Sequence, residues 1–153
     1  MSLEARLQAM GYSLPEAAQP AFQYVPVTVH AGVAYVAGQL PKVDGEVRIF
    51  GKVGAEVSIE QAEEAARICI LQGLACLVET LGGSDRIERI LKVTGFIASA
   101  PGFNAQPKVL DAASFLLFEA MGDAGRHARS AVGVAELPRN APVEIELIAA
   151  VRA

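Results

Sequence analysis

The chain has 153 residues, of which 52% are hydrophobic and 20% charged, a balance typical of one globular domain rather than a disordered segment. Thirteen basic and seventeen acidic residues give a net charge of −4, which excludes the strongly basic surface that general nucleic-acid binding requires. No stretch approaches the roughly 18 apolar residues of a membrane span. Glu4, Arg6 and Gln8 interrupt the N-terminus where a secretory signal would be apolar. We therefore expect a cytoplasmic protein that binds neither membrane nor nucleic acid.

Two cysteines and two histidines limit the metal and redox chemistry of the chain. Cys69 and Cys76 are seven residues apart in a predicted helix, a rise of about 10 Å that is too long for a disulfide between them. Neither a CxxC nor an HExxH motif is present. We expect no metal site, and we interpret both thiols as core residues.

The first 22 residues are predicted to be a helix followed by a loop. Ser2 is a suitable N-cap for a helix over 1–10, Gly11 can end it, and two prolines prevent regular structure in the loop over 11–22. We expect 1–22 to be an N-terminal extension and 23–153 to be a single domain.

Short strands follow. The runs 23–30 and 33–38 are rich in β-forming residues and flank a hairpin turn at 30–32. Pro26 favours an edge strand or the start of a strand. A second turn over 41–45 contains an Asp-Gly pair and precedes a predicted strand over 46–50.

Two longer helices enclose another strand. Ser58 and Gln61 have capping-box spacing, and an apolar stripe continues to the glycines at 82–83. Apolar residues off this stripe need a second cover, for which the N-terminal helix is a candidate. The strand over 90–99 is apolar on both faces and is predicted to be central. The second helix begins near Pro107 and ends at Gly122.

Two final strands, 129–137 and 141–151, are joined by a turn at 138–140 and are predicted to be neighbours. The element order indicates an α+β fold with a mixed six-stranded sheet and two helices on one face. On the last strand one set of alternate residues is wholly apolar, whereas the other combines Glu144 and Glu146 with two apolar residues. The second face therefore needs a cover, and we expect a homo-oligomer packed sheet to sheet.

Arg129 is the strongest candidate for chemistry. The chain has no P-loop, no GxGxxG motif and no GxSxG elbow. Arg129 begins a strand of small residues, where a guanidinium needs a carboxylate from the protein or from a ligand. Glu144 and Glu146 on the predicted neighbouring strand are available acids. A structural Arg–Glu pair and an anionic-ligand site both remain open.

Four segments carry a resemblance to a known family: YVP at 24–26, VAGQLP at 36–41, ARSAVGVAELP at 128–138 and VEIELIA at 143–149. In this order they resemble the RidA/YjgF family of reactive intermediate deaminases, in a divergent bacterial branch, from about 24 to 151. The resemblance implies a chorismate-mutase-like fold, a homotrimer whose sheets form an inner barrel, and small-molecule pockets between subunits. Active members hydrolyse enamines and imines such as 2-aminoacrylate to 2-keto acids and ammonia, without a cofactor.

The resemblance also assigns residue roles by position. Arg129 matches the arginine that grips the substrate carboxylate, and Glu144 matches the acid that orients the attacking water. Tyr24 and Gly38 match pocket residues. Ala131 and Asp111 stand where the family often has cysteine and asparagine, and we include both in the predicted substrate site.

Further departures concern pocket polarity. Ala37 stands where the family often has serine, and Gly133 where it often has glutamate. Asp111 could repel a carboxylate. The sequence does not decide whether Glu144 or Glu146 faces the pocket, because strand register cannot be derived from one chain.

The sequence therefore supports three hypotheses for the function. The first is an enamine/imine deaminase acting on amino-acid-derived intermediates. The second is a trimeric protein that binds a small carboxylate without turnover. The third is an endoribonuclease or translation inhibitor, a label that some family members carry and that the net charge of −4 argues against.

Overall fold

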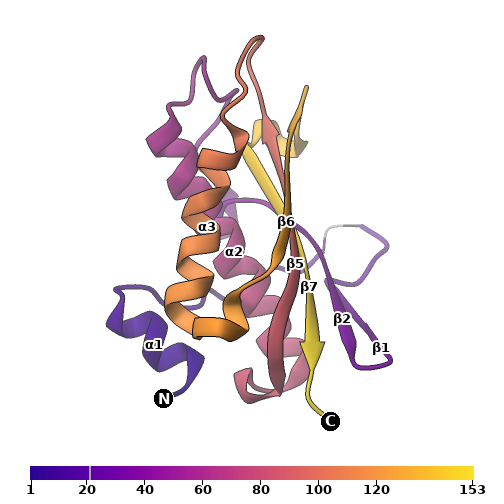
Figure 1. The fold of residues 1–153 in the computed structure, drawn as a ribbon. Coiled ribbons are helices and arrows are strands. Elements are labelled where there is room, and N and C mark those ends of the chain that lie inside the picture. Colours follow the sequence, from indigo (N-terminus) through magenta and orange to yellow (C-terminus); the bar gives the residue numbers. More distant parts are fainter. Residues whose placement is uncertain (21) are drawn as a thin grey trace.

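The computed structural model describes residues 1–20 and 22–153, and its elements follow the predicted order (Figure 1). The helices are α1 (Leu3–Ala9), α2 (Ile59–Leu81) and α3 (Gln106–Met121), with short 3-10 helices η1 (Ser84–Arg86), η2 (Gly122–Gly125) and η3 (Pro138–Asn140). The strands are β1 (Val27–His30), β2 (Val33–Gln39), β3 (Lys42–Val43), β4 (Glu46–Val47), β5 (Ile87–Ala98), β6 (Ala128–Val134) and β7 (Val143–Val151). The predicted loop over 11–22 includes Ala21, which lies outside the described residues.

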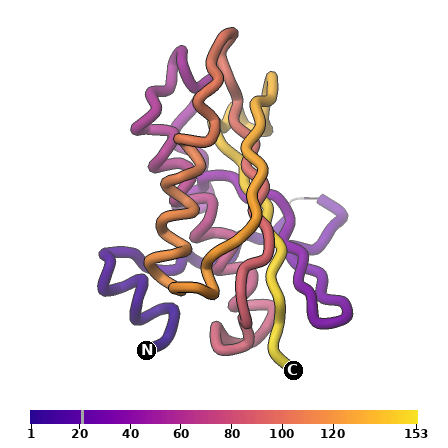
Figure 2. The backbone as a smooth tube through the Cα atoms, viewed as in Figure 1, coloured from indigo at the N-terminus to yellow at the C-terminus, as the bar shows by residue number. Residues whose placement is uncertain are grey.

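The main sheet has the strand order β1-β2-β7-β5-β6. Strands β5 and β6 are parallel and the other neighbours are antiparallel, so the predicted mixed sheet is confirmed. Helix α3 makes the crossover between the two parallel strands, a path that Figure 2 traces from β5 through α3 to β6. The α+β architecture with helices on one face is therefore present.

Two details of the predicted sheet are wrong. The described residues form a five-stranded sheet rather than a six-stranded one, because Glu46–Val47 pairs with Lys42–Val43 in a separate small hairpin. The last two strands are not neighbours, because β5 lies between them. The end of β5 is held from both sides: Ala98 N–H donates to the carbonyl of Pro142 at 2.9 Å, and Ser99 N–H donates to Val134 at 3.0 Å.

The helix ends are formed as the capping signals predict. The hydroxyl of Ser58 accepts from Gln61 N–H at 3.1 Å, and the Gln61 side chain accepts from Ser58 N–H at 2.9 Å. Gly82 ends α2 in the left-handed region at φ 81°. At the N-terminus, Ser2 caps α1 by accepting from Ala5 N–H. These local signals determine where α1 and α2 begin and where α2 ends, whereas α3 begins after Ala105 without a side-chain cap.

The core lies between the sheet and the two long helices, α2 and α3, which cover the same face in Figure 1. The predicted alternation of β7 is confirmed, because its core-facing residues are all buried: Val143, Ile145, Leu147 and Ala149. The opposite face is partly open in a single chain. Tyr35 and Val132 lie there and retain 49% and 42% exposure.

The N-terminal helix α1 packs against α3 and η1 and places Leu3 and Leu7 in the core (Figure 1). The second cover of α2 is supplied in part by the segment that follows α1. Ser13 and Pro15 line a surface hollow together with Ile68 and Leu71 of α2. This segment therefore runs across α2 on its way to β1.

Candidate functional site

Three of the predicted site residues line one cavity. Tyr24, Gly38 and Glu144 belong to the segment before β1, to β2 and to β7, and they surround a cavity of about 190 Å³. Residues 18–20, Phe22 and Pro26, the turn after β2 and the turn Pro138–Asn140 complete its described walls. Residues far apart in the sequence thus converge at the end of the sheet where β7 begins.

Gly38 is in close contact with Glu144. A Cβ atom built on Gly38 would lie 2.5 Å from Oε1 and 3.0 Å from Cδ of Glu144. The pairing of β2 with β7 is irregular between Val36 and Gln39, so Gly38 lies in a bulge of the ladder. Only a residue without a side chain lets the carboxyl group lie against this strand.

The carboxyl group of Glu144 is partly removed from water. Burial, and then the charge of Glu146, raise the pKa of Glu144 above its usual range. Glu146 is two residues further along β7 and is exposed, and it is not part of the cavity lining. Of the two acids that the sequence left open, Glu144 is therefore the one at the cavity. A desolvated carboxyl in a hollow is typical of groups that exchange protons.

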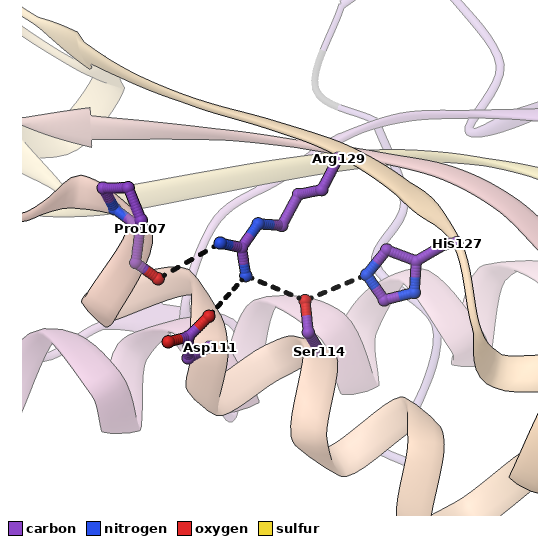
Figure 3. Close-up of polar contacts among 5 residues, drawn as sticks. All are labelled: Pro107, Asp111, Ser114, His127 and Arg129. Carbon is purple, nitrogen blue, oxygen red and sulfur yellow. Dashed lines mark hydrogen bonds and ion pairs between the residues drawn. The ribbon is translucent and has the colours of Figure 1, made fainter.

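Arg129 belongs to a second cluster, shown in Figure 3. Its Nη1 lies 2.8 Å from Oδ1 of Asp111 and 3.1 Å from the hydroxyl of Ser114, both on α3. Nη2 donates to the carbonyl of Pro107 at 3.4 Å. The guanidinium is largely shielded, with 22% side-chain exposure, whereas Asp111 is 71% exposed. Asp111 therefore pairs with Arg129 in this chain.

His127 extends the same cluster. Its Nε2 lies 2.9 Å from the hydroxyl of Ser114, and its Nδ1 lies 2.7 Å from the carbonyl of Gly125. Because a carbonyl can only accept, Nδ1 carries a proton, and in the neutral ring Nε2 accepts from Ser114. The serine oxygen is then free to accept from Arg129. Figure 3 shows this chain of contacts from His127 to the guanidinium.

Arg129 and Glu144 lie on opposite faces of the sheet. Arg129 is in register with Val93, which is fully buried on the helix-covered face. Glu144 is in register with Phe96, three positions further along β5 and therefore on the other face. Of the two alternatives that the sequence left open, a direct pair of Arg129 with Glu144 or Glu146 on a neighbouring strand does not form within one chain, because β5 separates β6 from β7. The anionic-ligand site stays a prediction.

Comparisons with known proteins agree on one family. The family model described as "YjgF/chorismate_mutase-like, putative endoribonuclease" matches residues 4–151. The chain belongs to the YjgF family. Protein TCP17 of Trypanosoma cruzi is similar, with 41% identity over 145 residues that make up 94% of this chain and 91% of that protein.

Solved structures of YjgF-family and related proteins share the fold. Protein Atu1372 from Agrobacterium tumefaciens is 42% identical, with a TM-score of 0.92 and coverage of 98% of this chain and 92% of that one. A "putative endoribonuclease" from Shewanella oneidensis is 31% identical, with a TM-score of 0.94 and coverage of 98% and 99%. Escherichia coli TdcF with bound serine is 26% identical, with a TM-score of 0.67 and coverage of 90% and 94%.

The two small residues of β6 that the sequence analysis marked as departures, Ala131 and Gly133, have a local explanation in this chain. Ala131 packs against the core, in register with Gly95. A Cβ at Gly133 would lie 2.8 Å from Nε2 of Gln106 and 3.0 Å from the hydroxyl of Ser99, which are bonded to each other at 3.2 Å. The space next to Gly133 is thus already filled by polar groups of the chain.

Sequence reasoning did not include two basic residues in the site of this YjgF-family chain. Lys42 and Arg139 line the same cavity as Glu144. Both stand in segments that the sequence marks only as turns. The only local sequence signal was the predicted turn at 138–140. In the structure, Arg139 and Asn140 of this turn adopt positive φ of 57° and 56°. The direction of their side chains depends on packing between distant segments.

The remaining expectations concern metals, thiols and membranes. Among residues 1–20 and 22–153, no three His, Cys, Asp or Glu side chains are grouped as a metal site would require. Cys69 and Cys76 are free and buried, and burial raises the pKa of both thiols. No helix in the described part of the chain is both long and apolar enough to span a bilayer.

Proposed function

We propose that the protein is an enamine/imine deaminase that hydrolyses small amino-acid-derived intermediates to 2-oxo acids and ammonia. The observation that carries the proposal is the carboxyl group of Glu144. It is desolvated, its pKa is raised, and it lies against Gly38 in a cavity that Tyr24 also lines. A carboxyl group with a raised pKa can both accept and return a proton near neutral pH.

In the proposed reaction, the enamine first takes a proton from solvent at its terminal carbon and becomes the protonated imine. A water molecule then adds to the imine carbon while its proton passes to Glu144. The same carboxyl returns the proton to nitrogen. The carbon–nitrogen bond then breaks and ammonia leaves, while the hydroxyl proton of the tetrahedral intermediate passes to Glu144 as the carbonyl forms, and from there to solvent. The reaction consumes one water and needs neither an oxidant nor a cofactor.

The substrate carboxylate needs a cation, and we assign this role to Arg129 of a neighbouring copy of the chain. Arg129 and Glu144 of one chain lie on opposite faces of the sheet, so no small substrate can touch both. A trimer supplies the second copy, because Arg129 stands on the edge strand β6 with part of its side chain exposed, and a neighbouring chain that covers the open sheet face can extend past this edge. The exposed Tyr35 and Val132 on that face support an interface between chains.

The ion pair with Asp111 is compatible with this role. Asp111 is mostly exposed, and an exposed partner contributes little to stability. An incoming carboxylate can replace it or share the guanidinium, because an arginine has five N–H donors. Ser114 and the carbonyl of Pro107 hold the guanidinium in position meanwhile.

The proposal is tested by a coupled assay. A pyridoxal-phosphate dehydratase generates 2-aminoacrylate, and formation of the 2-oxo acid is followed with and without the protein. Glu144→Gln and Arg129→Met are each expected to lower the acceleration by about 100-fold or more, since each removes a group acting on the reacting atoms. Two matched controls should retain activity: Glu146→Gln on the same strand as Glu144, and Arg126→Met in the loop before the strand of Arg129. No acceleration by the folded wild-type protein contradicts the proposal.

The second candidate function is binding of a small carboxylate without turnover. The structure of the similar protein TdcF, which contains bound serine, supports this candidate. The cavity of this chain is of a size that suits such a small carboxylate. Serine or a 2-oxo acid that binds in calorimetry, without any acceleration of imine hydrolysis, would establish this function instead. Cleavage of RNA in the same preparations would support the activity that the family description names.

A further inference from the structure

The cavity that contains Glu144 has two cations of its own. Lys42 stands at the start of β3 and Arg139 stands in η3, and both line the cavity. The titratable groups in its described lining are these two cations, the Glu144 carboxyl and the Tyr24 phenol. Even with Glu144 ionised, the cations outnumber the anion, so the cavity favours an anionic guest.

In the described part of the chain, neither cation forms an ion pair. Within residues 1–20 and 22–153, the ion pairs engage Arg48, Lys52, Arg67, Arg126 and Arg129, but not Lys42 or Arg139. The two charges are close enough to affect each other: burial first, and then the charge of Arg139, lower the pKa of Lys42. Two positive charges that line one cavity repel each other, and an anion bound between them offsets this repulsion.

The backbone holds Arg139 in place at a conformational cost. Arg139 and the following Asn140 both adopt left-handed conformations, which residues with a side chain rarely do. The turn is fixed by Ala141 N–H donating to Pro138 at 3.2 Å and by Gly51 N–H donating to Asn140 at 2.9 Å. Such strain persists where the surrounding structure enforces it, and it is concentrated at ligand sites.

We infer that Lys42 and Arg139 form a second anion-binding subsite, which selects substrates that carry a second carboxylate in addition to the one beside the reacting carbon. The substrate class is then the 2-imino acids derived from acidic amino acids. This inference rests on the proposed function for the place of the reacting carbon, beside Glu144. The first carboxylate is held by Arg129 of the neighbouring copy, and the second lies between Lys42 and Arg139.

Binding of two stable 2-oxo acids tests the subsite independently of turnover. 2-Oxoglutarate and 2-oxopentanoate differ only in a terminal carboxylate against a methyl group. The wild-type protein is expected to bind 2-oxoglutarate about tenfold more tightly or better, as charge-assisted hydrogen bonds to one extra carboxylate would give. In the double variant Lys42→Met/Arg139→Asn, the ratio of the two dissociation constants, 2-oxopentanoate over 2-oxoglutarate, should fall to about one or two. Asparagine is chosen at 139 because it tolerates the left-handed conformation.

The controls separate this inference from the proposed function. Arg48→Met removes one charge from the neighbouring hairpin, outside the cavity lining, and should leave the ratio unchanged. A wild-type ratio near one, a ratio that persists in the double variant, or failure of both acids to bind at millimolar concentration overturns the subsite. If the ratio behaves as expected but no imine is hydrolysed, the subsite stands and the deaminase proposal fails.

Discussion

Gly38 and Glu144 are fitted to each other across the β2–β7 ladder. The Glu144 side chain occupies the space that a Cβ on residue 38 would need, with Oε1 only 2.5 Å from that position. The glycine therefore sets where the carboxyl group lies, and burial in this position contributes to its raised pKa. The relationship joins a backbone feature of one strand to the proton chemistry proposed for another.

Replacing Gly38 by alanine is expected to displace the carboxyl group while leaving it in the protein. A shift of about 1 Å in a reacting group can lower a rate by about 100-fold, so we expect a fall in kcat/KM of that order. Gly83→Ala is the matched control, because a Cβ there would also lie 2.5 Å from a carboxylate oxygen, that of Asp85 on a remote surface turn. Equal activity of the two variants would show that the position of Glu144 is unimportant.

Glu144→Gln should separate stability from function. The raised pKa means that the folded protein binds a proton more readily than the unfolded chain, so stability falls as the pH rises from 4.5 through the folded pKa. The Glu144→Gln variant has no carboxyl group at this position, so it does not lose stability in this way as the pH rises. We expect it to be more stable than wild type at pH 8 by less than about 1 kcal/mol, since solvent screens a half-exposed group. The gain should shrink toward pH 4, as urea unfolding at both pH values can measure. A gain that is the same at pH 4 and pH 8 would contradict the assigned burial effect.

The helices and the faces of the strands were predictable because they depend on neighbours in the sequence. The capping box at Ser58 and Gln61 and the alternation from Val143 onward are local patterns with a direct physical meaning. The family resemblance also indicated Tyr24, Gly38 and Glu144, which the structure brings to one cavity.

Strand pairing was not predictable to the same degree. The short turn Pro138–Asn140 looks like a hairpin connection, yet it carries the chain across the end of β5. That choice depends on α3 returning the chain parallel to β5, which no local pattern records. For the same reason the sequence offered only Glu144 and Glu146 as acids for Arg129, whereas Asp111 on α3 lies 2.8 Å away.

Asp111→Asn tests the competition between the ion pair and the substrate. Removing the negative charge frees the Arg129 guanidinium for an incoming carboxylate, so KM is expected to fall by about two- to fivefold with little change in kcat. The cost in stability should stay below about 1 kcal/mol, because Asp111 is mostly exposed. Asp123→Asn, which removes a more exposed ion pair with Arg126, is the control. An increase in KM would instead place Asp111 in substrate binding.

Ser114→Ala removes the hydroxyl that links His127 to Arg129. Both partners lose a hydrogen bond, so we expect a loss of about 1 to 2 kcal/mol in the free energy of unfolding. The loss should be much smaller when His127 is already alanine and Arg129 already methionine, as a double-mutant analysis by chemical unfolding can show. Full additivity would mean that the linked contacts do not contribute jointly.

The most direct test of the account is mixing of two inactive variants, because its central claim is that Arg129 and Glu144 of different copies share one site. Arg129→Met and Glu144→Gln chains, distinguished by tags, are co-expressed and the mixed oligomers isolated. Each isolated mixed trimer contains both variants, so one of its three interfaces pairs an intact Arg129 with an intact Glu144, and about one third of wild-type activity should return. If both residues acted within a single chain, no mixture could restore an intact site, and the absence of any recovered activity would contradict the shared site.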